Sequence, residues 1–573
     1  MTKRINIVHF IYVLVLVFGL MPLVSPYMQP RFEKASIDEL LEVGNEPVAK
    51  EKIIVLLQQN ISDKEKWELI QKYMIDGDLA HRFDVYIGPS ITSWPNPSNQ
   101  NVFTVEETMP YLEEYIENGP VDGYMQSAAK QLANYYQQQG NSEKADQLLV
   151  KAAVRSYNDS KDYYVNDLFK MRVKIALTTN NFSKVESLID EMEEQEKRAS
   201  SNVDLQTIIP LLEVEKLLHQ GKLLQAYERL SKDIDRLKKQ WNEENNKLAD
   251  MSKQAEQQPL NDLQFENGVF SSELISIKQL LDTAIKKGNT TLTTIEGRIT
   301  KSNGDPMAGV GVFLRDEASV NMSVRDDERH QTLTDENGYY QFTGVIPGKY
   351  EIHLGVKQGQ VDGWAWSLPK DQWIHIKGDQ KITYDIEFHP LIKIVEPVHY
   401  KVISSKEVRF KWDEVNEAEY YDLNLCLEFE NGSTCSAIQT PIQKNEFTIP
   451  IEELYEKSTG IIFSGDGSRI ETVEPASLLG YTNSEGEFSW YVRAYKKDGS
   501  VITQSNGYIF NKRLLDEVPI FYLKERKLTK ADQLLLDKKL SEALELYKQA
   551  VSENPNDTHS QRMITRLIEF EGE

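Results

Sequence analysis

The sequence predicts a multidomain protein in which α-helical regions alternate with antiparallel β-sandwiches, behind an N-terminal membrane helix. Three observations predict this fold class. Apolar residues recur at three- and four-residue spacing over 32–287 and again within 512–573, as on one face of a helix. They alternate with polar residues over 293–390 and 391–511, between Asn-Gly and Pro-Gly turns, as in paired strands. A nearly uninterrupted apolar run fills residues 5–24 and is long enough to cross a bilayer as a helix.

The N-terminal segment 1–26 is expected to be a signal-anchor. Lys3 and Arg4 precede the apolar run and keep the N-terminus in the cytoplasm, so the bulk of the chain lies outside the cell membrane as a single-pass protein. The alternative is a secreted protein released by signal cleavage. Pro26 and the bulky Leu23 disfavour cleavage after Ser25, so we favour the anchor.

Composition limits the classes of partner. The 573 residues are enough for three or four domains, and the formal net charge is −24. A charge of this sign opposes long-range attraction to nucleic acid and to anionic membrane surfaces. We therefore expect no nucleic-acid partner and a well-hydrated ectodomain.

A helix–turn–helix pattern recurs in both helical regions. It places a turn residue, then a small residue five positions later, then a larger apolar residue four positions after that. This pattern resembles the tetratricopeptide repeat, which implies a concave, peptide-binding surface; the alternative is a generic helical bundle. Asp233 departs from the pattern, because it stands where a small residue is usual. The copies include Gly140/Ala145/Leu149/Ala152, Asn180/Val185/Ile189/Met192, Gly221/Ala226/Leu230 and the C-terminal Ala543/Tyr547/Ala550/Pro555.

One helix of the first region carries apolar residues at heptad positions. We expect it to form an antiparallel hairpin with the apolar helix that follows Pro259; a self-associating coiled coil is the alternative. Residues 83–103 interrupt the helical pattern with apolar and Pro-rich sequence, and we interpret them as a buried connector rather than a docking loop. The heptad residues are Tyr227, Leu230, Ile234, Leu237, Trp241, Leu248 and Met251.

The segment 294–354 has the clearest strand pattern in the chain. The residues that alternation places on the core face are Ile295, Gly297, Ile299, Val310, Val312, Leu314, Tyr340, Phe342, Tyr350, Ile352 and Leu354. The segment resembles the carboxypeptidase regulatory-like domain, a transthyretin-like sandwich. In metallocarboxypeptidases that domain lies beside the catalytic domain and supplies no catalytic residue, so the resemblance implies fold rather than activity. Its similarity to carbohydrate-binding-like folds leaves glycan binding open. The matching residues are Gly297, Asn303, Gly304, Pro306, Ala308, Gly309, Val310, Thr334, Asp335, Asn337, Gly338, Tyr340, Phe342, Pro347, Gly348 and Tyr350.

The second β region resembles a fibronectin type III-like sandwich. An early strand presents Val408, Phe410 and Trp412 on one face, and a late strand presents Phe488, Trp490, Val492 and Ala494. The insertion between Ile451 and Tyr481 is longer than usual for that fold.

Cys426 and Cys435 are the two cysteines of the chain and flank an Asn-Gly turn signal. If Asn431 and Gly432 form a two-residue turn, Cys435 faces Glu428, and the diagonal to Cys426 exceeds the roughly 7 Å Cα limit for a disulfide. A turn shifted by one residue brings the cysteines opposite each other. An extracytoplasmic disulfide is permitted, and both arrangements stay open.

Trp364, Trp366 and Trp373 form the best candidate for a ligand site, because aromatic faces stack on sugar rings. The favoured interpretation is core packing, since Trp364 and Trp366 lie two apart on one strand face. The acidic run Arg325–His330 lacks the spacing of a calcium loop and is read as a solvated loop. We expect no catalytic residue, no metal and no cofactor.

The sequence therefore predicts a non-enzymatic, membrane-anchored scaffold at a bacterial cell envelope. Its expected partners are envelope or membrane proteins, or peptides. Glycan binding by the first sandwich is the second hypothesis, and a hydrolase with an unrecognised carboxylate site in the helical region is the third.

Overall fold

The structure is a computed structural model of the whole chain. Within the part of the chain that it describes, no helix is both long and apolar enough to cross a bilayer. The expected membrane helix at residues 5–24 lies outside that part. The described residues are 36–41, 45–59, 61–75, 83–89, 91–93, 103–159, 165–198, 203–254, 265, 271–324, 328–378, 381–429, 432–457, 459–463, 472–508 and 518–572.

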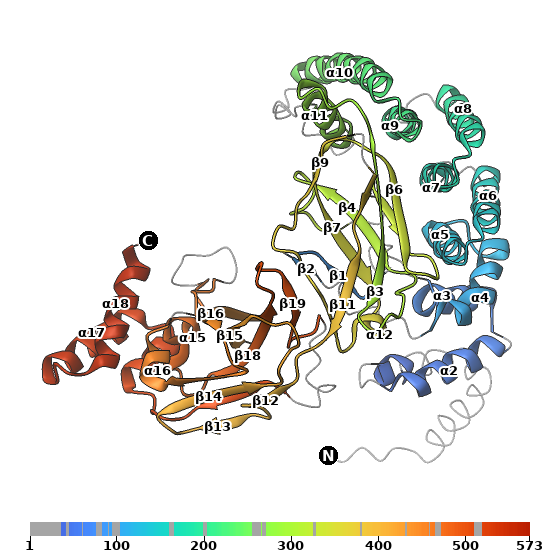
Figure 1. Cartoon of the computed structure of the whole chain (residues 1–573). Helices are drawn as coiled ribbons and strands as arrows, with labels where there is room; N and C mark the ends of the chain where they lie inside the picture. Colours follow the sequence, from blue (N-terminus) through green and yellow to red (C-terminus); the bar gives the residue numbers. More distant parts are fainter. Residues whose placement is uncertain are drawn as a thin grey trace, which may run out of the picture.

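The first helical region is an arc of helices stacked side by side around the first sandwich (Figure 1). Each helix packs against the next one along the chain, most extensively in the pair α5–α6 and then in the pair α9–α10. Their bounds are α2 Glu46–Gln58, α3 Asp63–Tyr73, α4 Val105–Asn118, α5 Gly123–Gln138, α6 Ser142–Asn158, α7 Val165–Thr178, α8 Phe182–Arg198, α9 Val203–His219, α10 Leu223–Gln254 and α11 Ser272–Lys286.

The recurring sequence pattern corresponds to a recurring turn. Gly140, Asn180 and Gly221 each end a helix with positive φ, at 68°, 52° and 75°. In each turn the next residue's N–H donates to the carbonyl five positions earlier, which is the Schellman arrangement of a helix end. Lys538, with φ 60°, ends α16 in the same way. The residues five and nine positions after each turn residue are at most 1 % exposed: Ala145, Leu149, Val185, Ile189, Ala226, Leu230, Ala543 and Tyr547.

Asp233 shows how one copy tolerates its departure from the pattern. The side chain is buried on α10, where a carboxylate without partners would be costly. Arg229 Nε lies 2.6 Å from one carboxylate oxygen, and Arg236 Nε lies 3.6 Å from the other. Ion pairs within the same helix therefore offset the burial of this charge.

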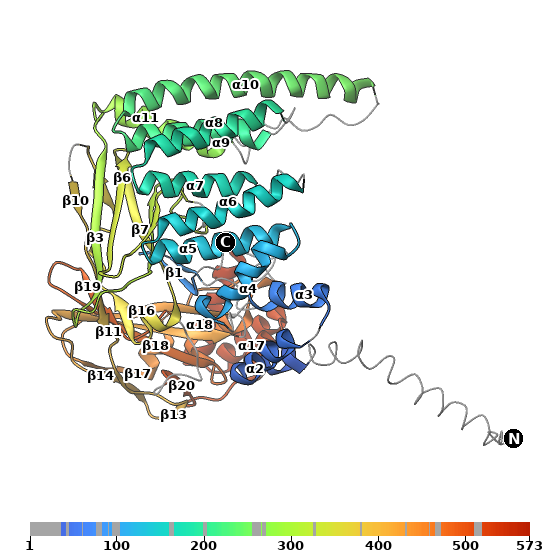
Figure 2. The ribbon, with the colours of Figure 1, turned by 90° about the vertical axis from the view of Figure 1, so that its right-hand side faces the viewer.

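The long helix α10 packs against α11, as expected for a helical hairpin (Figure 2). Leu230, Ile234 and Leu237 of the heptad are buried in the same cluster as Leu274, Ile277 and Leu281 of α11. The side chains of Leu248 and Met251 lie outside the described ones, so the self-associating alternative stays a prediction.

The first sandwich consists of two sheets. One has the strand order β2-β1-β7-β4-β5 with β9 beside β7, and the other has β10-β3-β11-β8 with β6 beside β3. Residues predicted to face its core are at most 4 % exposed: Ile295, Ile299, Val310, Val312, Leu314, Tyr340, Phe342, Tyr350, Ile352 and Leu354. The bounds are β1 Val85–Ile87, β2 Thr92–Ser93, β3 Thr293–Lys301, β4 Gly311–Asp316, β5 Gln331–Leu333, β6 Tyr339–Val345, β7 Gly348–Val356, α12 Gln358–Val361, β8 Trp364–Trp366, β9 Ile374–Ile376, β10 Lys381–Thr383 and β11 Ile386–Pro390.

The interpretation of residues 83–103 as a connector is wrong for the described part. Residues 85–87 form β1, which pairs antiparallel with β7 of the sandwich, and residues 92–93 form β2, which pairs with β1. The sequence signal was ambiguous because a three-residue strand is too short to show alternation. The helical region thus supplies strands to the first sandwich.

The second sandwich has sheets of strand order β12-β14-β17 and β13-β20-β18-β15-β16, with β19 beside β18. Strand alternation predicts its core faces, and Phe429 at the end of β15 departs from the prediction because it is only half-buried. The other predicted core residues are at most 3 % exposed: Val408, Phe410, Trp412, Tyr421, Leu423, Leu425, Leu427, Phe488, Trp490, Val492 and Ala494. The bounds are β12 Ile394–Glu396, β13 Lys401–Ile403, β14 Glu407–Trp412, β15 Tyr420–Phe429, β16 Gly432–Ile442, β17 Glu446–Pro450, α13 Ile451–Tyr455, α15 Pro475–Leu479, η5 Gly480–Thr482, β18 Glu487–Tyr495, β19 Val501–Gln504 and β20 Ile520–Leu523.

The second sandwich extends further along the chain than expected. Strand β20 lies in the segment 512–573, which we expected to be helical, and it pairs with both β13 and β18. Helices follow only from Lys530: α16 Lys530–Leu536, α17 Leu540–Glu553 and α18 Thr558–Gly572. In Figure 1 they pack on the far side of the second sandwich from the arc.

Hydrogen bonds join the two sandwiches. Leu368 and Val501 form an isolated bridge, with N–H to carbonyl distances of 3.1 and 2.8 Å. Nearby, Thr503 Oγ1 of β19 donates to Pro390 O of β11 at 2.7 Å. These contacts continue the hydrogen bonding of one sandwich into the next, which limits rotation between them.

The inner side of the helical arc faces the first sandwich (Figures 1 and 2). Lys174 of α7 donates to the Glu328 carbonyl at 3.1 Å, and His219 Nδ1 lies 3.0 Å from Thr343 Oγ1 of β6. A repeat array was expected to offer its concave side to a peptide. Here the first sandwich of the same chain contacts that side.

Candidate functional site

The three tryptophans of the predicted ligand site differ in burial and in the strands that carry them. Trp366 is buried in the core of the first sandwich, and its backbone N–H donates to Tyr508 Oη of the second sandwich at 2.8 Å. Trp364 is half-buried against the same core, with Lys301 Nζ 4.8 Å from its ring centroid. Trp373 is half-buried before β9, and its backbone N–H donates to the Asp371 carboxylate. Trp366 therefore belongs to the joint between the sandwiches rather than to an open stacking platform.

The described end of the acidic run Arg325–His330 is not a free solvated loop. Glu328 Oε2 accepts a hydrogen bond at 3.0 Å from Arg315, whose side chain is 2 % exposed, and its carbonyl accepts from Lys174. Arg325 to Asp327 lie outside the described residues. Glu328 thus connects the sandwich to the helical arc.

Cys426 and Cys435 form a disulfide in this structure, with Cα atoms 4.0 Å apart. They are directly opposite in the β15–β16 ladder, in which Phe429 pairs with Gly432. This register is shifted by one residue from the one that an Asn431-Gly432 turn would give, and the shift removes the diagonal. A turn position cannot be read to one residue from an Asn-Gly signal alone.

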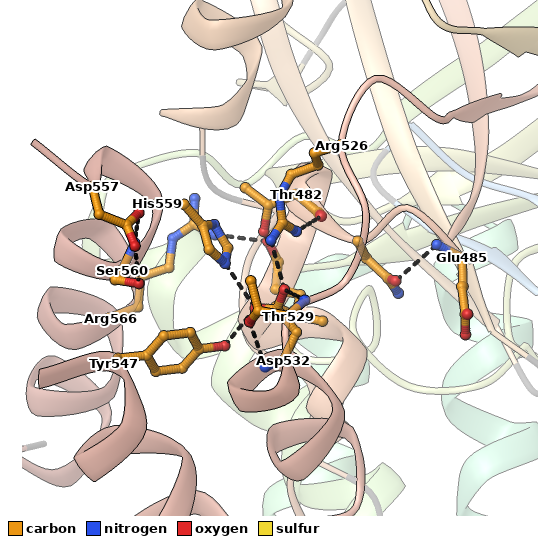
Figure 3. A network of polar contacts seen from close by, with 12 residues as sticks. Thr482, Glu485, Arg526, Thr529, Asp532, Tyr547, Asp557, His559, Ser560 and Arg566 are labelled. Atoms are coloured by element: carbon orange, nitrogen blue, oxygen red, sulfur yellow. Dashed lines mark hydrogen bonds and ion pairs between the residues drawn. The ribbon is translucent and has the colours of Figure 1, made fainter. Parts of the chain in front are cut away.

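A dense polar cluster lies where the C-terminal helices meet the second sandwich (Figure 3). At its centre is Asp532, at the start of α16, with no exposed surface. Thr529 caps that helix through a capping box with Asp532, accepting from its N–H while the carboxylate accepts from Thr529 N. This local exchange fixes the orientation of the carboxylate.

Three more side chains converge on the same carboxylate (Figure 3). Tyr547 Oη of α17 donates at 2.6 Å, and His559 Nε2 of α18 lies 2.7 Å from the same oxygen. Arg526 donates to the other oxygen at 2.6 Å, and it also donates to the Thr482 carbonyl of the sandwich at 2.6 Å. Asp532 therefore connects three helices and, through Arg526, the second sandwich.

The charges of this cluster follow from its hydrogen bonds. Burial acts to raise the pKa of Asp532, but the contacts with His559, Tyr547 and Arg526 outweigh it and bring the pKa well below its usual range. Burial and the adjacent carboxylate raise the pKa of Tyr547. At neutral pH the cluster thus holds an ionised carboxylate and a neutral phenol.

A second contact of the same joint involves Arg566 of α18. Burial, with a smaller effect of Arg562, lowers its pKa to about 10, so the guanidinium remains charged at neutral pH. It donates to backbone carbonyls at the C-terminal ends of two short helices, where carbonyls lack partners within the helix. These acceptors are Leu478 O at 3.3 Å and Leu479 O at 2.8 Å at the end of α15, and Tyr455 O at 2.9 Å at the end of α13 with Lys457 O at 3.3 Å two residues beyond it.

This cluster is suited to holding parts together rather than to chemistry. A general base must reach a proton on a substrate, and Asp532 is fully buried with both oxygens occupied. Tyr547 with a raised pKa is a poor proton donor. The sequence signal that could have located the cluster is Thr529-x-x-Asp532, the pattern of a capping box.

A different pair of ionisable groups lies on β7 of the first sandwich. Glu351 and His353 are 4 % and 3 % exposed, and Oε2 lies 3.6 Å from Nε2. Burial raises the pKa of Glu351, whereas burial and the nearby Arg315 lower the pKa of His353 to about 4. Within the described ranges, no three His, Cys, Asp or Glu side chains gather so that they could hold a metal ion.

Comparison with known proteins supports one domain of the sequence analysis. Residues 294–360 match the carboxypeptidase regulatory-like domain family, which confirms the expected domain in this part of the chain. The match describes this domain and not the whole chain. Comparison with curated proteins gave no match.

Solved structures give weaker similarities. A DUF3823 family protein from Bacteroides ovatus is 14 % identical, covering 41 % of this chain and 100 % of its own, with a TM-score of 0.14. BcpA, the major pilin subunit of Bacillus cereus, is 11 % identical, covering 40 % of this chain and 69 % of its own, with a TM-score of 0.15. The FN1–FN3 domains of chicken CNTN1 are 13 % identical, and the similarity covers 36 % of this chain and 59 % of theirs, with a TM-score of 0.11. Similarity at this level carries no argument about function.

Proposed function

We propose that this protein is a non-enzymatic scaffold that presents binding surfaces to other proteins. The main support is the use of its buried polar groups. Asp532 and Arg566 hold the C-terminal helices on the second sandwich, and Arg315 with Glu328 links the first sandwich to the arc. Groups that would be candidates for catalysis are engaged in joining one part of the chain to another.

The regulatory-like domain is consistent with this role. Its family supplies a sandwich beside other domains, and residues 294–360 hold that place between the helical arc and the second sandwich. We further infer that the helical hairpins are degenerate repeats of the tetratricopeptide type. The repeated turn and the buried positions five and nine residues after it support this inference.

Photo-crosslinking tests the scaffold function. The full chain is produced in its source cell with a photoreactive residue at the exposed Val154 or Leu224 on the arc, or at Ile568 on α18. Membranes of these cells are then illuminated, and adducts are purified after solubilisation in detergent. We expect discrete adducts with a defined protein from at least one position. Adducts equal to those of the same protein unfolded in urea would contradict the proposal.

We also propose that residues 5–24 anchor the protein in the cell membrane with the bulk outside the cytoplasm. The apolar run and the basic residues before it support the anchor. The Cys426–Cys435 disulfide supports an oxidising compartment. Intact cells treated with external protease should lose the body of the protein but retain the anchor. A protected body, or both cysteines alkylated as free thiols in fresh extracts, would contradict this placement.

Glycan binding through the tryptophans remains a weaker candidate. Only Trp364 and Trp373 keep exposed ring surface, and Lys301 lies over the first. A glycan array probed with the full chain tests this function directly. Binding that disappears in Trp373→Ala would favour it over the scaffold alone.

A further inference from the structure

The outer face of the first sandwich has a notch made of two glycines. Gly311 of β4 and Gly355 of β7 are direct cross-strand partners. Neither has the positive φ that would require glycine for the backbone. The phenyl ring of Phe83 fills the space instead: a Cβ atom built on Gly355 would lie 2.3 Å from this ring, and one on Gly311 would lie 2.5 Å from it.

The residues after Phe83 engage β7 in register. Val85 pairs with Val356, Tyr86 with Gly355 and Ile87 with Leu354. Val85 and Ile87 are buried in the sandwich core, whereas Tyr86 packs with Phe83 and Phe313 on the outer face. Alternate side chains of one short strand therefore occupy two apolar environments.

Asp84 adds a polar contact at the end of β7. Its N–H donates to Val356 O at 3.0 Å. Its carboxylate accepts from Gln358 N at 2.7 Å and from Lys357 Nζ at 3.3 Å. The acid thus faces a backbone donor and a cation directly after the strand.

We propose that the edge of β7, with the Gly311–Gly355 notch and the Lys357–Gln358 donors, is a recognition site for an extended peptide segment. The segment that it selects has an aromatic residue, an aspartate, and then alternating apolar and aromatic residues. In this protein the occupant is its own Phe83–Ile87, in cis. Main-chain pairing supplies affinity, and the notch and donors supply specificity, as in other cases of strand addition to a sheet edge.

This site goes beyond the scaffold function, because it explains how the arc and the sandwich are held together. The hairpin comes from between α3 and α4, more than 200 residues before the matched family domain. The notch belongs to the domain and its occupant to the helical region. The site therefore couples the placement of α3 and α4 to the sandwich.

A double-mutant cycle in the full chain tests the notch. Gly355→Ala and Phe83→Ala should each speed amide exchange of residues 85–87 by at least tenfold, the first by displacing the ring and the second by removing it. In the Phe83→Ala background, Gly355→Ala should have less than a threefold further effect, because the added methyl then has room. Gly359→Ala, whose Cβ would meet nothing within 4 Å, is the matched control and should leave exchange unchanged.

Additive effects of the two substitutions, or an unchanged exchange rate in Gly355→Ala, would contradict the proposal that the notch recognises the Phe83 ring. Far-UV circular dichroism separates these outcomes from general unfolding. If Gly355→Ala does not fold, Gly311→Ala in the same cycle replaces it, since Phe83 also lies against Gly311.

A peptide in trans tests the selectivity. The full-length variant Phe83→Ala/Asp84→Ala/Tyr86→Ala should bind a synthetic peptide of residues 83–93 saturably. Wild-type protein should bind it at least tenfold more weakly, because its site is occupied. A peptide with alanine in place of Phe83 should also bind at least tenfold more weakly. Absence of binding by the folded variant, or equal binding of both peptides, would contradict a recognition site.

Discussion

The two helical parts of this protein are attached to their sandwiches by different physical means. The N-terminal arc contributes a strand to the first sandwich and places an aromatic ring on two glycines. The C-terminal helices are held on the second sandwich by buried charges, with Asp532 and Arg566 at the centre. The joint of the arc depends on side-chain packing and main-chain pairing. The joint of the C-terminal helices depends on hydrogen bonds and ion pairs of buried charged groups. The two joints should therefore fail under different changes.

The charged joint should show the largest effect of a single substitution. Asp532→Ala leaves Arg526, Tyr547 and His559 without their common acceptor in a buried site, which costs about 3–5 kcal/mol of unfolding free energy for the C-terminal part. Urea unfolding followed by hydrogen exchange of α16–α18 measures it. Glu545→Ala on the exposed face of α17 is the control and should stay within about 0.5 kcal/mol of wild type. Equal loss of protection in the arc would contradict separate joints.

Phe83→Ala should loosen the joint between the arc and the first sandwich and leave the C-terminal joint unchanged. Removing a buried phenyl ring costs about 3–4 kcal/mol, because the transfer energy is lost and a cavity remains. We expect faster exchange in β1 and β7 and unchanged exchange in α18. Ile91→Ala, an exposed residue between β1 and β2, is the matched control. The comparison fails if the C-terminal helices loosen as well.

Arg566→Met should have a smaller effect than Asp532→Ala. The methionine keeps the apolar stem of the arginine but leaves the carbonyls after α13 and α15 without a charged donor, at a cost of about 2–3 kcal/mol. Lys548→Met on the exposed surface of α17 is the control. Thermal unfolding in low and high salt distinguishes this buried contact from a surface ion pair, because only the latter is strongly screened. A loss that vanishes in high salt would contradict the burial.

Acidification should lower the stability of the first sandwich but not that of the C-terminal joint, and this is the smallest of the effects predicted here. Folded His353 has a pKa of about 4, below its usual range, so between about pH 6.5 and 4 the unfolded chain binds a proton that the folded chain does not. Stability therefore falls as pH decreases through this window. Glu351, whose pKa burial raises, opposes this trend, because its folded form binds a proton more readily. The pKa of Asp532 is lowered, so this carboxylate stays ionised and continues to stabilise the C-terminal joint down to a much lower pH.

The measurable consequence is a pH slope in the first sandwich. Between pH 7 and 5 we expect the shifted pKa of His353 to cost the first sandwich about 2 kcal/mol of unfolding free energy, less the opposing effect of Glu351. In His353→Gln this loss should shrink, whereas His375→Gln, on the exposed part of β9, should retain it. A slope that persists unchanged in His353→Gln would assign it to other groups, such as His219, whose pKa is also lowered to about 4 by burial and by Arg329.

The sequence predicted what depends on local pattern. Alternation identified the core faces of both sandwiches, and the offsets of the repeat identified Ala145, Val185, Ala226 and Ala543 as buried. These features depend on residues a few positions apart, where strand and helix periods apply directly. The family match at 294–360 is likewise carried by turn glycines and core residues within one domain.

The sequence did not predict contacts between distant segments. Nothing near Phe83 indicates that its ring packs on glycines more than 220 residues away, and a three-residue strand shows no period. Asp532 was missed because its partners come from α17, α18 and the loop before α16. Cys426 and Cys435 were left open because their pairing depends on one residue in the position of a turn.

Hydrogen exchange of the full chain at neutral pH tests the central claim, that two distinct joints hold the helical parts on the sandwiches. The account predicts that amides of β1 are protected as well as those of β7, and amides of α18 as well as those of β18. It also predicts that Phe83→Ala speeds exchange in β1 and β7 but not in α18, and that Asp532→Ala speeds exchange in α16–α18 but not in β1. Rapid exchange of β1 and α18 in the wild-type protein, beside fully protected sandwiches, would contradict it.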